Sequence, residues 1–104
     1  MNIQEQIDQV VKENKIMLFI KGSREQPQCG FSAKVVHILE ILEANYECID
    51  VLLDSEICQG IKEYSDWPTI PQLYVNGEFL GGCDIITELY INGELDGIIK
   101  GESN

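Results

Sequence analysis

The sequence is poor in positive charge and has neither a long apolar run nor a close pair of cysteines. Lysine and arginine together number 7 against 18 aspartate and glutamate residues, which gives a formal net charge of −11. This balance argues against nucleic acid and anionic membrane surfaces as partners. The longest apolar run, residues 16–20, is far too short to span a bilayer. We therefore expect a protein that binds neither nucleic acid nor a membrane.

The four cysteines, at positions 29, 48, 58 and 83, lack the close-pair spacing of a structural zinc site. The first residues have neither the basic start nor the apolar stretch of a signal peptide. We therefore expect a cytoplasmic protein with reduced thiols, and a cleaved organelle presequence is the alternative. A length of 104 residues suits one domain with a modest core, so residues 1–104 are expected to form a single domain.

Hydrophobic periodicity and turn residues predict five helices and four strands. The helices are expected between residues 2 and 14, 29 and 44, 55 and 65, 84 and 92, and 94 and 100; the strands are expected at residues 16–20, 46–51, 72–75 and 78–80. The first two strands, joined through a helix, imply a parallel pair with a right-handed crossover, and Asn76-Gly77 predicts an antiparallel hairpin. The predicted fold class is α/β: a four-stranded mixed sheet flanked by helices in three layers.

Within these elements, the same patterns assign individual positions. Phe31 begins the apolar face of the second helix, and Asn45 is expected to cap the end of that helix near Ala44. Asp84 is the expected N-cap of the fourth helix, and Ile85 is expected to point into the core.

Cys29 follows a polar loop that contains Pro27, and it stands on the first turn of a helical pattern. Free backbone N–H groups and the positive end of the helix dipole stabilise a thiolate there, and Lys21 at the end of the preceding strand adds positive charge. The alternative is a buried, inert cysteine, but the polar and turn residues around Cys29 favour an exposed site. Ser32 occupies the place of the second thiol in a Cys-x-x-Cys motif. Any second thiol must therefore come from elsewhere.

The other thiols and the lone histidine have less distinctive surroundings. Cys48 lies among apolar residues of a strand and is interpreted as a packing residue. Cys58, on the short third helix, has no role that the pattern reveals. Cys83 follows two glycines at a helix start, so its backbone N–H is an anion donor. His37 is interpreted as solvent-facing, with no ligand role.

Four motifs together resemble the monothiol glutaredoxins of the Cys-Gly-Phe-Ser class. They are Lys21-Gly22, Cys29-Gly30-Phe31-Ser32, Trp67-Pro68-Thr69-Ile70-Pro71-Gln72 and Gly81-Gly82-Cys83-Asp84. The insert between Ser23 and Gln28 also resembles this class, and the resemblance covers about residues 3–100. It implies the thioredoxin fold, and it implies that the bond before Pro71 is cis, although only about 5–6% of X–Pro bonds are.

The resemblance also implies that glutathione binds beside Cys29. In the family, the lysine matching Lys21 faces the glycine carboxylate and the active thiol, and the backbone at Ile70 pairs with the cysteinyl unit. The N–H groups at Cys83 and Asp84 receive the γ-glutamyl carboxylate, and the Asp84 carboxylate faces the ammonium group. Each assignment suits the charges that glutathione carries.

A [2Fe–2S] cluster needs four ligands, and Cys29 with one glutathione thiol from each of two chains supplies them. The resemblance therefore implies a dimeric carrier that delivers clusters to acceptor proteins and that is a poor oxidoreductase. It also implies a BolA-like helper partner, which the family often binds. The alternative is a glutathione-dependent thiol–disulfide oxidoreductase that removes glutathione from proteins through Cys29. A redox- or iron-sensing interaction module is the third reading.

One position departs from the family. An arginine usually stands on the short helix to meet the glycine carboxylate, in a run resembling Ile-Arg-Gln-Gly-Leu-Lys, where this chain has Cys58. Either that contact is lost or Lys62, one helical turn later, replaces it. A disulfide between Cys83 and Cys29 in the oxidised protein is a further open possibility.

Overall fold

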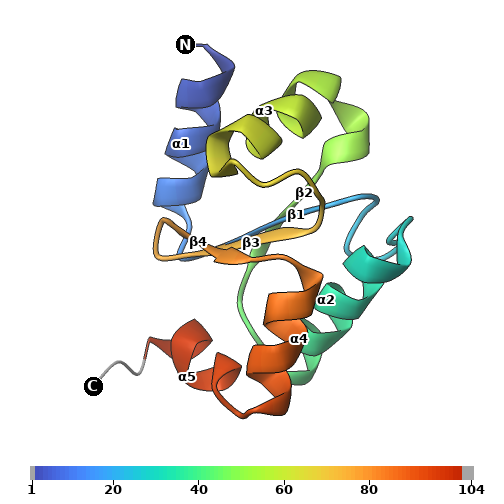
Figure 1. Cartoon of the computed structure of the whole chain (residues 1–104), viewed down its shortest axis with the longest axis vertical. Helices are drawn as coiled ribbons and strands as arrows, with labels where there is room; N and C mark the ends of the chain where they lie inside the picture. The colour runs from blue at the N-terminus through green and yellow to red at the C-terminus, as the bar shows by residue number, and fades with distance from the viewer. Residues whose placement is uncertain (1, 102–104) are drawn as a thin grey trace.

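The computed structural model describes residues 2–101 (Figure 1). Its helices are α1 (Ile3–Glu13), α2 (Gly30–Ile41), α3 (Ser55–Ser65), α4 (Cys83–Ile91) and α5 (Leu95–Lys100). Its strands are β1 (Ile16–Ile20), β2 (Glu47–Asp50), β3 (Gln72–Val75) and β4 (Glu78–Gly81), and a 3-10 turn, η1 (Val51–Leu53), follows β2. The order of helices and strands predicted from the sequence is confirmed.

The four strands form one mixed sheet in the order β2-β1-β3-β4. Strands β1 and β2 are parallel, whereas β3 runs antiparallel to both β1 and β4. Helices α1 and α3 cover one face of the sheet, and α2, α4 and α5 cover the other (Figure 1). The predicted three-layer α/β fold is confirmed, and it is the thioredoxin fold that the resemblance implied.

Strand β1 lies at the centre of the sheet, and all five of its residues are buried. Side chains alternate between the two faces of a strand. Accordingly, Ile16, Leu18 and Ile20 pack toward α2, whereas Met17 and Phe19 pack toward α1. A central strand covered on both faces needs such a continuous apolar run.

Two hydrophobic cores therefore lie on opposite faces of the sheet. The α2-side core comprises Ile16, Leu18, Ile20, Val35, Val36, Ile38, Leu39, Tyr46, Leu73, Val75, Ile86, Leu95 and Ile99. The α1-side core comprises Ile7, Val11, Met17, Phe19, Val51, Ile61, Ile70 and Tyr74. Strands β1 and β3 contribute to both cores, so they couple the two helical layers.

Helix α1 begins as predicted, but α2 ends earlier than predicted. At α1 the Asn2 side chain accepts from the Glu5 N–H at 2.9 Å, and the Glu5 carboxylate accepts from the Asn2 N–H at 3.1 Å. Helix α2 stops at Ile41 because Glu43 adopts a left-handed φ of 56° and the Ala44 N–H turns back to the Leu39 carbonyl at 3.0 Å. The prediction that α2 reaches Ala44 with Asn45 as its cap was therefore wrong.

Two other expectations about side chains were also wrong. Phe31 is 63% exposed and Ile85 is 41% exposed. Both residues line a groove described below, and apolar periodicity does not separate a residue that faces a site from one that faces the core. The N-cap of α4 is Gly82 rather than Asp84, because the Ile86 N–H donates to the Gly82 carbonyl at 3.0 Å.

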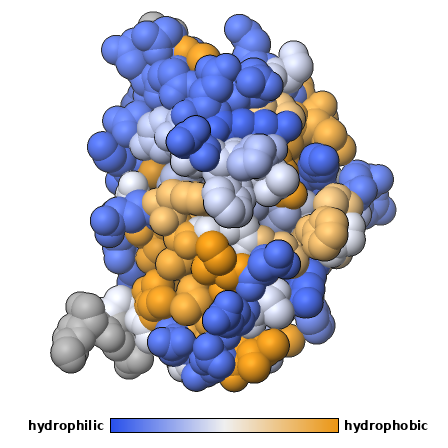
Figure 2. Space-filling view, in the orientation of Figure 1, coloured by the Kyte–Doolittle hydropathy of each residue, from blue (hydrophilic) through white to orange (hydrophobic). Residues whose placement is uncertain are grey.

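The hairpin between β3 and β4 is confirmed, with left-handed φ values of 54° at Asn76 and 83° at Gly77. Figure 2 shows a largely hydrophilic surface over α1 and apolar side chains gathered below the sheet, near α5. Among the described helices, none combines the length and the apolar character that crossing a bilayer requires.

Candidate functional site

Cys29 is the residue that caps the N-terminus of α2. It has extended backbone dihedrals, and its carbonyl accepts the first helical hydrogen bond, from the Ala33 N–H at 2.8 Å. Its side chain is partly exposed, as the sequence predicted. The N–H groups of the first turn, which an N-terminus leaves without helical partners, are therefore available to the sulfur.

The pKa of the Cys29 thiol lies below its ordinary value. The backbone N–H of Ser32 is the largest cause, and the N–H of Phe31, the Ser32 hydroxyl and the Lys21 ammonium act in the same direction, while partial burial opposes them. The thiolate is the nucleophilic and metal-binding form of cysteine. This position therefore suits either chemistry.

Ser32 is a site residue whose role sequence reasoning missed. Its side chain is fully buried, and its Oγ accepts from the Lys21 N–H at 3.1 Å. The residue thus joins the end of β1 to the first turn of α2, in addition to stabilising the thiolate. Its place three residues after a helix-capping cysteine was the available signal, but the sequence analysis considered it only as a missing second thiol.

The loop between Lys21 and Cys29 is closed by backbone hydrogen bonds. The Gln28 N–H donates to the Lys21 carbonyl at 2.8 Å, and Gly22 forms a bridge with Pro27. The Gly22 N–H donates to Asp50 Oδ1 at 2.9 Å, which joins the loop to the end of β2. Gly22 has φ 96°, a left-handed conformation that side chains rarely adopt.

A groove of about 560 Å³ runs past Cys29. All five residues predicted for the site line it: Lys21, Cys29, Ile70, Cys83 and Asp84. Its other lining residues are Phe31, Lys62, Trp67, Pro68, Thr69, Pro71, Gly82 and Ile85. The topology brings them together because the end of β1, the start of β3 and the N-termini of α2 and α4 share one edge of the sheet.

The wall of the groove before β3 is held by Gln72, whose role the sequence analysis also missed. Its side chain is fully buried and donates to the carbonyls of Trp67 and Thr69, both at 3.1 Å. The Tyr74 hydroxyl in turn donates to Gln72 Oε1 at 3.0 Å. The Ile70–Pro71 peptide bond is cis, as the resemblance implied.

The charges of the groove are two ammonium groups, from Lys21 and Lys62, and one carboxylate, from Asp84. Within residues 2–101, no side chain caps the N-terminus of α4, so the N–H groups of Cys83 and Asp84 remain available to an anion. The groove can therefore hold a ligand that carries more than one carboxylate together with an ammonium group.

The other cysteines occupy different environments. Cys48 packs against the α2-side core, and burial raises its pKa to about 11. Cys58 packs against the α1-side core and does not line the groove. Cys83 lines the groove, with its Sγ 3.9 Å from Thr87 Oγ1. His37 is exposed, as predicted. Within residues 2–101, no three histidine, cysteine or acidic side chains gather as a metal site.

The pH dependence of Cys29 alkylation tests the lowered pKa. With iodoacetamide and peptide-resolved mass spectrometry, the rate should show an inflection below the free-thiol value of ~8.5, because the thiolate persists to lower pH. Ser32→Ala should move this inflection upward, by less than the full shift because the N–H of residue 32 remains. Cys48 is the internal control and should react only at much higher pH. A Cys29 inflection at ~8.5 would contradict the assignment.

An activated cysteine at a helix N-terminus, beside a cis proline on this sheet, defines a thiol protein of the thioredoxin fold. The chain belongs to the glutaredoxin family and to its monothiol members. The family model described as Glutaredoxin matches residues 16–80.

Relatives and a solved structure agree with this assignment. The chain is 62% identical over 94 residues to a ycf64-like monothiol glutaredoxin of Synechocystis, covering 90% of this chain and 88% of that protein. It is 54% identical over 102 residues to the chloroplastic bifunctional monothiol glutaredoxin-S16 of Arabidopsis thaliana, covering 94% of this chain and 34% of that protein. The solution structure of reduced poplar apo GrxS14 superposes with a TM-score of 0.81 at 48% identity, over 95% of this chain and 91% of that one.

Proposed function

We propose that residues 1–104 act as one domain that binds glutathione and, as a dimer, carries a [2Fe–2S] cluster to acceptor proteins. The observation that carries this proposal is one activated, partly exposed thiol beside a groove whose charges complement glutathione. With Ser32 in place of a second thiol, the chain offers one thiolate ligand at this site rather than a local disulfide.

The groove accounts for each charged group of glutathione. The glycine carboxylate pairs with Lys21 and Lys62, and the γ-glutamyl carboxylate accepts from the N–H groups of Cys83 and Asp84. The Asp84 carboxylate faces the ammonium group. The backbone of Ile70 pairs with the cysteinyl unit as an added strand would. This arrangement brings the glutathione thiol toward Cys29.

The donor set then fits a cluster shared between two chains. Four thiolate-type ligands are required, and each chain supplies Cys29 and one bound glutathione. A lowered pKa suits Cys29 for this role, since the thiolate is the ligand form. The two glutathione ligands are not covalently attached to the protein, so the cluster is cargo that can be transferred to an acceptor.

Anaerobic reconstitution with iron and sulfide, with and without glutathione, tests the proposal. With glutathione we expect cluster absorbance and a dimer by sedimentation; without it we expect apo-protein that is mostly monomeric. A cluster assembled to full occupancy without any low-molecular-weight thiol would contradict the ligand count. It would point to Cys83 or Cys58 as a ligand instead.

Lys62 is the proposed substitute for the arginine that the family usually has at position 58, because Lys62 lines the groove and Cys58 does not. Lys62→Gln should weaken glutathione binding by about tenfold, since it removes a charge-assisted contact. Cys58→Arg should tighten binding, because a planar guanidinium pairs with a carboxylate better than an ammonium does.

The half-life of the cluster, measured at a series of glutathione concentrations, tests both Lys62→Gln and Cys58→Arg. Lys34→Gln, which removes an exposed lysine outside the groove, is the matched control and should behave as the original protein does. Identical curves for Lys62→Gln and this control would contradict the assignment of Lys62.

The second candidate function is glutathione-dependent oxidoreduction, which the lowered pKa of Cys29 favours. The Cys29 thiolate would attack the glutathione sulfur of a glutathionylated protein, forming a mixed disulfide and releasing the protein thiolate. A second glutathione thiolate would then attack that mixed disulfide, releasing oxidised glutathione and restoring Cys29. A sensor of iron or redox state would use the same dimer, and a partner protein would respond to whether the dimer carries its cluster.

The partners of this carrier are a second copy of the chain, acceptor proteins and a BolA-like protein. The sequence predicts that it works in the cytoplasm, whereas the Arabidopsis relative is named as chloroplastic. Fractionation of the source cells, followed by detection of the protein in each compartment, tests that location.

A further inference from the structure

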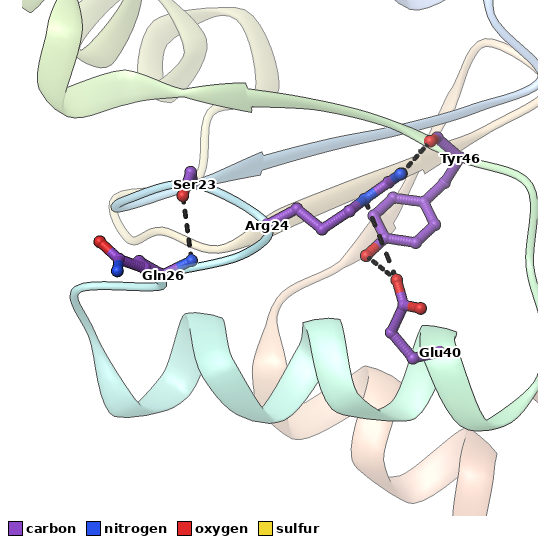
Figure 3. A network of polar contacts seen from close by, with 5 residues as sticks. All are labelled: Ser23, Arg24, Gln26, Glu40 and Tyr46. Carbon is purple, nitrogen blue, oxygen red and sulfur yellow. Dashed lines mark hydrogen bonds and ion pairs between the residues drawn. The ribbon is translucent and has the colours of Figure 1, made fainter.

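The Arg24 side chain fastens the loop before Cys29 to the rest of the fold (Figure 3). Its guanidinium lies over the Tyr46 ring, with Cζ 3.9 Å from the ring centroid, and its Nη2 donates to the Tyr46 carbonyl. Its Nε lies 3.9 Å from Glu40 Oε2, which places a carboxylate of α2 on the same group. Arg24 therefore joins the loop to α2 and to the residue that precedes β2.

The partners of Arg24 also contact each other and the core of the protein. Tyr46 is 3% exposed and belongs to the α2-side core. Its hydroxyl donates to Glu40 Oε2 at 2.8 Å, which fixes the carboxylate as well. An aromatic face, a carbonyl and a carboxylate thus surround a planar cation, and arginine matches such surroundings better than lysine.

The loop has few other links to the body of the protein. The described hydrogen bonds of Ser23 and Gln26 stay within the loop: the Gln26 N–H donates to Ser23 Oγ at 3.0 Å, and the Gln26 carbonyl accepts from the Ser23 N–H at 3.2 Å and from Gln28 Nε2 at 3.1 Å. Among the hydrogen bonds described for residues 22–28, the Gly22 N–H to Asp50 and the Arg24 contacts are those that reach other elements. Without Arg24, residues 23–26 at the tip of the loop have no described hydrogen bond to another element.

We propose that Arg24 is a positioning residue that holds the loop closed and thereby keeps Lys21 and Cys29 at their spacing across the groove. The two residues are the ends of this loop, and the Gln28 N–H closes it onto the Lys21 carbonyl at 2.8 Å. A loop released at Arg24 opens this closure more often, which loosens the start of α2 and the groove wall. That Arg24 holds the loop closed does not depend on the proposed function. That the closed loop serves glutathione and cluster binding rests on the proposed function.

Arg24→Gln tests the inference in the apo-protein, with Arg24→Lys as the conservative variant. In Arg24→Gln, hydrogen exchange at the Gln28 amide should quicken by about tenfold, because the cation–π contact and the ion pair are both lost. Iodoacetamide alkylation of Cys29 at pH 7 should slow by about threefold, as its inflection moves upward. In both measurements Arg24→Lys should give values between those of the original protein and of Arg24→Gln, because lysine retains a charge over the ring but lacks the planar fork.

Lys12→Gln is the matched control, since it removes an exposed ion pair with Asp8 on α1, away from the loop. It should leave both measurements unchanged. Unchanged exchange and alkylation in Arg24→Gln would overturn the inference without touching the proposed function. If both measurements change while the original protein fails to bind glutathione, the positioning role stands and the proposed function fails.

Discussion

Replacing Cys29 with serine is expected to abolish [2Fe–2S] binding, whereas Cys48→Ser should leave it nearly intact. Cys29 is partly exposed at a helix N-terminus and has a lowered pKa, so in the proposed function it would supply the thiolate that a cluster requires. Cys48 packs against the core, and burial raises its pKa to about 11, so its thiol stays protonated at pH 7. It therefore cannot replace Cys29.

Iron and sulfide content and cluster absorbance, measured after anaerobic reconstitution with glutathione, provide the readout. Cys58→Ser serves as a second control, because Cys58 packs against the other core and does not line the groove. Equal loss of cluster in the Cys29 and Cys48 variants would exclude Cys29 as the specific ligand.

Gly22→Ala should lower the free energy of unfolding by about 3 kcal/mol or more. Gly22 has a left-handed φ of 96°, and a Cβ there would lie 2.4 Å from the Gln28 backbone nitrogen and 2.7 Å from the Gln26 carbonyl oxygen. Both neighbours are backbone atoms of the closed loop, so they cannot move aside cheaply. The loop must open, and the mouth of the groove is lost with it.

Gly30→Ala is the matched control for this change. Gly30 begins α2, and a Cβ there would meet nothing within 4 Å, so alanine should be neutral or slightly stabilising. Urea unfolding followed by tryptophan fluorescence compares the two variants. A Gly22→Ala midpoint equal to that of Gly30→Ala would show that the loop tolerates a side chain at position 22.

The sequence predicted the elements whose signals are local. Strand β1 is an uninterrupted apolar run, and α3 has the predicted bounds of Ser55–Ser65. The end of α2 was not predictable in this way, because Glu43 adopts a left-handed conformation that its side chain does not favour. Gly82 was passed over as a cap because aspartate is the commoner choice at that position.

The predicted site residues were recognisable because each belongs to a short motif whose ligand contacts the resemblance implied. Ser32 and Gln72 stand in the same motifs and Arg24 stands outside them, but the roles of all three were missed because they depend on contacts made by folding. Ser32 accepts from Lys21, 11 residues earlier, and Arg24 donates to Tyr46, 22 residues later. A sequence shows a capable side chain at such positions, but it does not show which distant group that side chain meets.

The two cores on opposite faces of the sheet also determine when the groove can exist during folding. Lys62 and Trp67 come from the layer that contains α1 and α3, whereas Cys29 and Asp84 start the helices of the other layer. A partly folded chain with only one layer in place would have only one wall of the groove. Loss of binding in the groove and cooperative unfolding of the chain should therefore occur in the same transition. No partly folded intermediate should bind a ligand there.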